Sequence, residues 1–210
     1  EDYSSLESIR ATGGIVPDAE WERNREMVVR SLSITAELGV RFLTMHAGFI
    51  EEHDPARARR IRDRLVCLAD AAGERGRMLL METGQETAAS LRELLEDLDH
   101  PALGVNFDPA NLLIYNQDDP ADFLSLLADR VGVVHCKDGR RPEQAGQMGK
   151  ETPLGKGDTR FAELLLQLVG HGFRGPLIIE RELPLGPEQQ RDVAEAIAWL
   201  KQLRQQLLNA

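Results

Sequence analysis

Short apolar runs that alternate with helical patterns constrain the fold of this chain more than any other feature. Five runs have the length and composition of buried strands: VRFLTMH (40–46), RMLLMET (77–83), LGVNFD (103–108), VGVVHC (131–136) and PLIIERE (176–182). The segments between them carry apolar residues every three or four positions, and a first helix is expected at about residues 20–38. Such alternation predicts a parallel sheet covered by helices.

Two architectures fit this pattern, an open doubly wound sheet and a (β/α)8 TIM barrel. Five strands suit the open sheet, whereas a TIM barrel needs eight strands and usually about 250 residues. As a barrel, the 210 residues would form a single domain, 1–210, that shows only strands four to eight and is N-terminally incomplete, with strands one to three missing. The first strand continues as MHAGFIEEHD, which is not the glycine fingerprint of a dinucleotide site.

The carboxyl ends of the predicted strands favour the barrel. Side chains alternate across a strand, so the last inward residue of each strand can be read from the sequence. These residues are His46, Glu82, Asp108, His135 and Glu180. An open sheet gathers ligands only at its switch point, so five consecutive strand ends converge only if the strands curve around an axis.

Four of these residues form a plausible set of metal ligands. Taken singly, each has a structural alternative; Asp108 before Pro109 could form a turn, and Glu180 could pair with Arg181 or Arg174. Four unpaired ionisable groups in one dry site would be very costly, and a metal ion removes that cost. Carboxylate oxygens with one imidazole suit Mn²⁺, Mg²⁺ or Co²⁺ and are compatible with Zn²⁺. The predicted ligands are Glu82, Asp108, His135 and Glu180.

Composition narrows the class of partner. The formal net charge is −10, with 35 acidic and 25 basic residues, which argues against nucleic acid or an anionic membrane. Two cysteines make no disulfide framework, and no signal peptide or apolar stretch of about 20 residues is visible, so a cytoplasmic location is expected. The chain begins with Glu1 and not with methionine, which leaves an upstream segment open.

Several motifs together resemble a known superfamily. TMHAGF, METG, NFDPANLLIY, VVHCKD with the following PLGKGD, and GPLIIERE resemble the xylose isomerase-like TIM-barrel superfamily, the sugar phosphate isomerases and epimerases, from residue 1 to about 200. The resemblance implies that the four ligands hold a divalent metal and that Glu82 and Glu180 are also catalytic. They would exchange a proton with a sugar, or sugar phosphate, through an enediolate. The substrate would be a small sugar or polyol, and a homo-oligomer is open.

The resemblance also implies substrate contacts, with some departures from the family pattern. Arg140 or Arg141 would hold substrate oxygens, and His46 could contact the substrate. Lys137 points inward over the mouth, where it could meet a substrate oxygen or pair with a carboxylate. Asn111 stands where epimerases often carry a histidine, and it can still bind a hydroxyl. The endonuclease IV branch needs that histidine and others, so their absence argues against DNA repair. An inosose-type dehydratase and a catalytically silent sugar-binding barrel remain as alternatives.

Two further expectations concern local structure and stability. Asp54-Pro55, Asp119-Pro120 and Asp158-Thr159 have the pattern of helix starts. If strands one to three are missing from the molecule, the first strand exposes its edge. Residues 1–210 expressed alone would then aggregate or unfold.

Overall fold

The computed structural model describes the chain except for residues 1, 3, 50–54, 145 and 209–210. Its α-helices are α1 (Leu6–Thr12), α2 (Trp21–Glu37), α3 (Pro55–Gly73), α4 (Ala88–Leu98), α5 (Pro109–Ile114), α6 (Pro120–Leu127), α7 (Phe161–Gly170) and α8 (Pro187–Leu208), with short 3-10 turns η1 (Asp18–Glu20) and η2 (Ala128–Arg130). Its strands are β1 (Phe42–Met45), β2 (Met78–Glu82), β3 (Leu103–Phe107), β4 (Val131–Cys136), β5 (Asp138–Arg140), β6 (Lys150–Thr152) and β7 (Leu177–Ile179).

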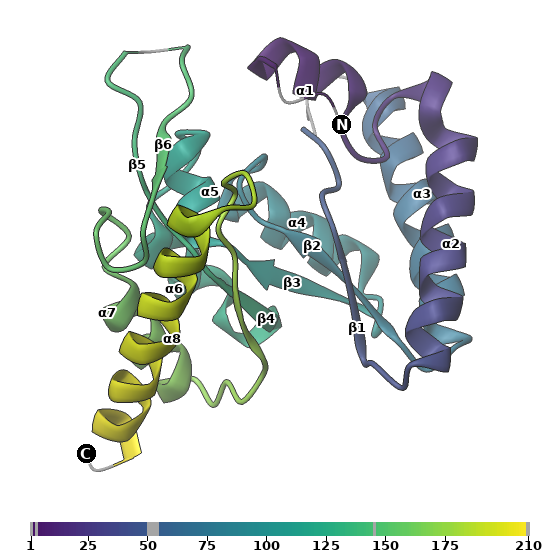
Figure 1. The fold of residues 1–210 in the computed structure, drawn as a ribbon. Helices are drawn as coiled ribbons and strands as arrows, with labels where there is room; N and C mark the ends of the chain where they lie inside the picture. The colour runs from purple at the N-terminus through teal and green to yellow at the C-terminus, as the bar shows by residue number, and fades with distance from the viewer. Residues whose placement is uncertain (1, 3, 50–54, 145, 209–210) are drawn as a thin grey trace.

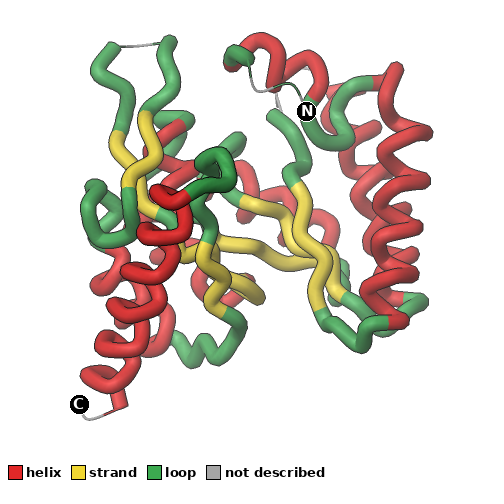
Figure 2. Tube along the Cα trace, viewed as in Figure 1, coloured by secondary structure: helices red, strands yellow, loops and turns green. Residues whose placement is uncertain are grey.

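Five strands form one parallel sheet in the order β1-β2-β3-β4-β7. The strands fan around an axis, with helices outside them (Figure 1): α2 and α3 lie beyond β1, and α8 lies beside β7. A short antiparallel hairpin, β5–β6, projects from the carboxyl end of β4 (Figure 2). The molecule is therefore an α/β fold with a five-stranded parallel half-barrel.

The main apolar core lies between the outer face of the sheet and the helices. Outward side chains of β3 and β4, such as Phe107 and Val134, pack against α6 and α7, and the rings of Phe107 and Phe123 stack at 5.6 Å. β2 is buried except for the half-buried Met78, and β3 is buried throughout. Among the described residues, no helix is both long enough and apolar enough to cross a lipid bilayer.

The two outer strands of the sheet are less covered than the central ones. Every residue of β1 is half-buried, and in β7 Leu177 and Ile178 are 40% and 43% exposed. Within the described chain, β1 pairs only with β2 and β7 only with β4. The predicted open edge at the first strand is therefore present in this structure.

A break in register within β4 decides which side chains face the inside of the curve. Val105 pairs with Val131 and Asn106 with Val133, so Gly132 is an extra residue in β4. A Cβ atom on Gly132 would lie 3.0 Å from Leu80 Cδ1, on the inner face. Such a bulge re-aims the residues that follow it, so Val133 and His135 face inward while Val134 and Cys136 enter the core.

Four of the five predicted strands are shorter in the structure than the sequence predicts. The predicted strand 176–182 is reduced to Leu177–Ile179, while 131–136 has the predicted bounds. The β5–β6 hairpin and α5 were not predicted. Asp119 caps α6 as expected, but the predicted cap at Asp158-Thr159 is wrong: α7 begins after Arg160, and no side chain caps it. α3 begins at Pro55 as expected, and its expected cap residue, Asp54, lies outside the described residues.

Candidate metal centre

The four predicted ligands lie at the carboxyl ends of four neighbouring strands. Glu82 is the last residue of β2, and His135 is the fifth of the six residues of β4. Asp108 follows β3 directly and caps α5, where its Oδ1 accepts a hydrogen bond from Asn111 N at 2.9 Å. Glu180 follows β7. Because the strands are parallel, these four ends meet at one rim of the half-barrel.

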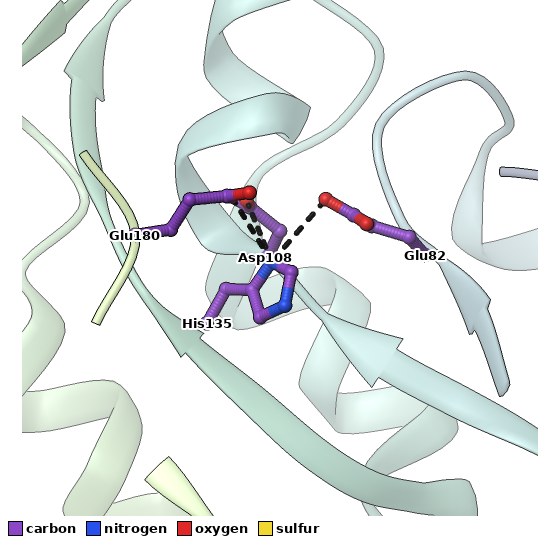
Figure 3. A group of neighbouring side chains, drawn as sticks. All are labelled: Glu82, Asp108, His135 and Glu180. Carbon is purple, nitrogen blue, oxygen red and sulfur yellow. Dashed lines mark ion pairs between the residues drawn. The ribbon is translucent and has the colours of Figure 1, made fainter. Parts of the chain in front are cut away.

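The side chains converge on one imidazole nitrogen (Figure 3). The Nδ1 atom of His135 lies 3.1 Å from Glu180 Oε2, 3.3 Å from Glu82 Oε1 and 3.5 Å from Asp108 Oδ2. One ligand atom from each of the four residues lies within 4.8 Å of the others. Glu82 and Glu180 approach the imidazole from opposite sides.

The donor set fits a divalent cation. Asp108 is fully buried, and its Oδ2 has no hydrogen-bond partner within the described chain. Glu82 and His135 are also buried, and the Glu180 side chain is 31% exposed. Three carboxylates in so dry a site need a positive charge between them. A hard divalent ion with open coordination positions supplies that charge and prefers these oxygen and nitrogen ligands.

The pKa shifts within the cluster also indicate that the carboxylates favour a positive charge between them. Burial lowers the pKa of His135, but its close contacts with the carboxylates of Asp108, Glu180 and Glu82 outweigh burial and raise the pKa to about 12. Burial raises the pKa of Glu180, yet its contacts with His135 and Lys137 lower it to about 2. The three carboxylates thus favour a positive charge at this position, and a divalent cation would supply it.

Asn106, on the inner face of β3, contacts the other nitrogen of the imidazole. Its Nδ2 lies 3.0 Å from His135 Nε2, and its Oδ1 has no hydrogen-bond partner among the described residues. A histidine that binds metal through Nδ1 carries its proton on Nε2. Turning the amide over brings Oδ1 to Nε2 as the acceptor and satisfies both groups. Asn106 is therefore placed to set the tautomer of His135.

Two of the predicted substrate contacts adjoin Glu82. His46 Nε2 lies 3.6 Å from Glu82 Oε1, and Asn111 Nδ2 donates to the same oxygen at 3.1 Å. His46 Nδ1 is buried and has no hydrogen-bond partner in the part of the chain that is described. Both residues lie at the centre, and Asn111 holds the Glu82 carboxylate by a hydrogen bond.

Lys137 enters the same cluster from the end of β4. Its ammonium lies 3.2 Å from Glu180 Oε2, 3.0 Å from Glu182 Oε2 and 3.3 Å from Asn111 Oδ1. Burial lowers the pKa of Lys137, but Asp108, Glu180 and Glu182 raise it above the ordinary value. Lys137 is thus a charged, fully buried partner of the carboxylates, which is one of its two predicted roles.

The structure gives the two predicted arginines other partners. Arg140 Nη2 donates to the carbonyl of Lys156 at 2.9 Å. Arg141 donates to Asn116 Oδ1 at 2.9 Å and to the carbonyl of Asp118 at 2.7 Å. Among the described residues, neither arginine bonds to Glu82, Asp108, His135 or Glu180. The structure therefore does not bring the two arginines into the cluster.

Sequence reasoning gave no role to two residues of the centre, Asn106 and Glu182. Each lies two positions from a predicted ligand, Asn106 before Asp108 and Glu182 after Glu180. Both residues therefore point to the same side of the strand as the ligand, and the alternation that identified the ligands could have identified them too. Glu182 also lines a cavity of about 330 Å³ beside the cluster, with Asn111, Ile114, Tyr115 and Met148. This cavity offers a polar end and an apolar wall to a small ligand.

Comparison with known proteins finds one family along most of the chain and a close structural relative. The profile of the family described as xylose isomerase-like TIM barrel matches residues 6–203. The crystal structure of a xylose isomerase domain protein from Planctomyces limnophilus is 33% identical, has a TM-score of 0.95, and is matched over 100% of this chain and 76% of its own.

Two more distant relatives add detail. A xylose isomerase-like TIM barrel protein from Mycobacterium smegmatis, solved in complex with magnesium, shares the fold at 20% identity, with a TM-score of 0.74 over 92% of this chain and 70% of its own. The inosose dehydratase of Salmonella agona is 29% identical over 114 residues. That match spans 49% of this chain and only 38% of the dehydratase.

Proposed function

The chain belongs to the xylose isomerase-like TIM barrel family, and we propose that it acts as a divalent-metal-dependent isomerase or epimerase of a small sugar. The observation that carries the proposal is the convergence of Glu82, Asp108, His135 and Glu180 within 4.8 Å at the carboxyl ends of the strands. Active sites of TIM barrels lie at this end.

We assign the metal to these four side chains. A bound Mn²⁺, Mg²⁺ or Co²⁺ would polarise a substrate carbonyl and so acidify the adjacent C–H bond. The magnesium in the Mycobacterium smegmatis relative agrees with an oxygen-rich site of this kind.

Glu82 and Glu180 are proposed as the acid and base. They approach the centre from opposite sides (Figure 3), so one carboxylate can remove a proton from one face of a carbon while the other delivers a proton to the opposite face. The contacts of Glu180 with His135 and Lys137 outweigh its burial and lower its pKa to about 2, so the carboxylate is ionised at neutral pH. Asn111 donates a hydrogen bond to the Oε1 of Glu82, and His46 lies 3.6 Å from the same oxygen.

The remaining residues of the centre bind and orient. Asn111 and Glu182 line the cavity beside the cluster and can hydrogen-bond substrate hydroxyls, while Ile114, Tyr115 and Met148 can pack against C–H groups. Lys137 neutralises the carboxylates on the Glu180 side. The exposed Arg140 and Arg141 would reach substrate oxygens only by leaving their present partners.

A dehydratase of cyclic ketopolyols is the second candidate, favoured by the 29% identity to inosose dehydratase. That reaction begins with the same proton removal; the C–O bond on the next carbon then breaks, and the hydroxyl leaves as water after taking a proton from the acid residue. The two candidates differ only in the fate of that hydroxyl, so the same residues serve both.

The test is an incubation of the intact protein with Mn²⁺ in heavy water against ketoses and inososes. An epimerase or isomerase gives a product of unchanged composition that carries deuterium at the reacting carbon, whereas a dehydratase gives a product that has lost water. Glu180→Gln should abolish either reaction. Sugar binding without metal uptake and without deuterium incorporation would replace both candidates with a catalytically silent binding barrel.

A further inference from the structure

The segment that carries Glu180 leaves the sheet before it reaches the metal centre. The last pair of the β4–β7 ladder is Cys136 with Ile179. Beyond it, Glu180 N donates to the Cys136 carbonyl at 3.5 Å, which is at the limit of a hydrogen bond. Other contacts must therefore set the position of this ligand, because a neighbouring strand does not.

Arg181 supplies those contacts on the side away from the cluster. Its Nη1 lies 3.1 Å from Glu151 Oε1, on the β5–β6 hairpin, and its Nε lies 3.0 Å from Asp192 Oδ2, on α8. The three side chains are only 10%, 11% and 5% exposed. Arg181 is thus held between two acids that come from different elements, and each charge in the group has a partner.

The same group also holds the backbone around Arg181. Both carboxylate oxygens of Glu151 accept the N–H of Glu182, at 3.2 and 3.0 Å. Gln189, at the start of α8, donates from Nε2 to the Arg181 carbonyl at 3.0 Å. The hydrogen bonds to the Glu182 N–H and to the Arg181 carbonyl thus hold the backbone where the β4–β7 pairing has ended.

Side-chain alternation links this group to the chemistry. Arg181 points outward between the hairpin and α8, while Glu180 and Glu182, on either side of it, both reach the Lys137 ammonium. We propose that Arg181, with Glu151 and Asp192, is a positioning clamp that aims Glu180 at the metal centre. The inference rests on the proposed function only in taking Glu180 as a metal ligand.

The test measures Mn²⁺ affinity in the intact protein by competition with a fluorescent chelator, for Arg181→Gln and for the milder Glu151→Gln and Asp192→Asn. Outer partners of metal ligands typically change affinity by about tenfold to hundredfold, and we expect Arg181→Gln to weaken Mn²⁺ binding by that amount. Arg181→Lys should restore part of the affinity, because it keeps the charge and loses the two-sided geometry.

Arg64→Gln is the matched control. Arg64 is equally buried, at 10%, and it bonds to Asp18 and to the carbonyls of Ile15 and Val16, outside the centre. Its loss should lower the melting temperature and leave Mn²⁺ affinity within about twofold of wild type. Folded clamp variants that retain full affinity, or an Arg64→Gln variant that weakens it equally, would overturn the clamp.

A second readout does not depend on metal. Amide hydrogen exchange in residues 180–183 should rise in Arg181→Gln and Glu151→Gln, because the Glu182 N–H loses its fixed acceptor, and should stay unchanged in Arg64→Gln. Unchanged exchange in the clamp variants would overturn the proposal. Failure of the wild type to bind Mn²⁺ would instead overturn the proposed function, and the exchange data would still decide on the clamp.

Discussion

His135 Nδ1 lies 3.1 Å from Glu180 Oε2, and this is the shortest of the three contacts between the imidazole and the carboxylates. The contact joins the end of β4 to the segment that follows β7. It therefore closes the ring of four ligand atoms on the side where the sheet ends. A cation between these atoms would relieve the repulsion among three carboxylates.

Metal binding should therefore stabilise the fold measurably. We expect Mn²⁺ to raise the melting temperature of the intact protein, by an amount that corresponds to about 2.7 kcal/mol when the free metal is 100 times Kd. His135→Ala should remove this rise, since it removes the central ligand. Differential scanning fluorimetry with a Mn²⁺ titration measures the effect.

His100→Ala is the control, because His100 bonds to Asp70 outside the cluster. It should respond to Mn²⁺ as the wild type does. A wild-type protein that is indifferent to Mn²⁺ and Co²⁺, or a His135→Ala protein that is stabilised equally, would contradict the assigned site.

Asn106→Leu should weaken metal binding without removing a ligand. The variant keeps the side-chain size but loses the polar contact to His135 Nε2, so the tautomer that presents Nδ1 to the metal is no longer favoured. We expect a loss of about tenfold to hundredfold in Mn²⁺ affinity, measured by equilibrium titration. Asn24→Leu removes a comparable bond, to the Gly14 carbonyl, and should leave the affinity unchanged.

Gly84→Ala should destabilise the fold and disturb Asn111. Gly84 has a φ of +131°, and a Cβ there would lie 2.5 Å from Asn111 Cβ and 3.0 Å from Tyr115 Cδ2. Gly76, with a φ of +63° and open space around it, separates backbone strain from the clash. Gly84→Ala should cost about 1–3 kcal/mol more than Gly76→Ala in urea unfolding. Equal costs would mean that Asn111 yields freely.

Glu86 should make the free energy of unfolding decrease as the pH rises. Burial raises the pKa of Glu86 from 4.5 to about 8, and its Oε1 has no hydrogen-bond partner among the described residues. Between these two values the folded protein holds a proton that the unfolded chain has released. The free energy of unfolding should therefore decrease as pH rises through this window, by up to about 1.4 kcal/mol per pH unit.

Glu86→Gln should abolish this slope and exceed the wild type in stability at about pH 8, as measured by urea unfolding across the pH range. Glu93→Gln, at an exposed position on α4, should retain the wild-type slope. A slope that survives in Glu86→Gln would show that another group titrates.

The open edges of the sheet should cause self-association of the 210-residue polypeptide. Leu177 and Ile178 are exposed on β7, and β1 at the other edge has only one neighbour in the described structure. We expect concentration-dependent association in sedimentation, reduced by Ile178→Lys, because a charge at an edge opposes pairing. A monomer with a sharp cooperative melt would contradict this expectation and support a self-sufficient open sheet.

Much of the centre could be predicted because strand alternation is a local rule. Counting back from the polar ends of five apolar runs identified Glu82, Asp108, His135 and Glu180 as inward groups, and the structure brings them within 4.8 Å. The rule works because parallel strands present their carboxyl ends at one rim, so one periodic pattern, repeated along the chain, describes a place in space.

What the sequence by itself determined is thus the class of fold, the curved parallel sheet and the group of residues at its rim. Only the tertiary structure decided how each side chain is held. The extra residue Gly132 shifts the register of β4 against β3, Asn106 meets the far nitrogen of His135, and Arg181 joins Glu151 to Asp192 behind Glu180. These relations depend on register and on contacts between elements distant in sequence, and no local periodicity encodes either of them.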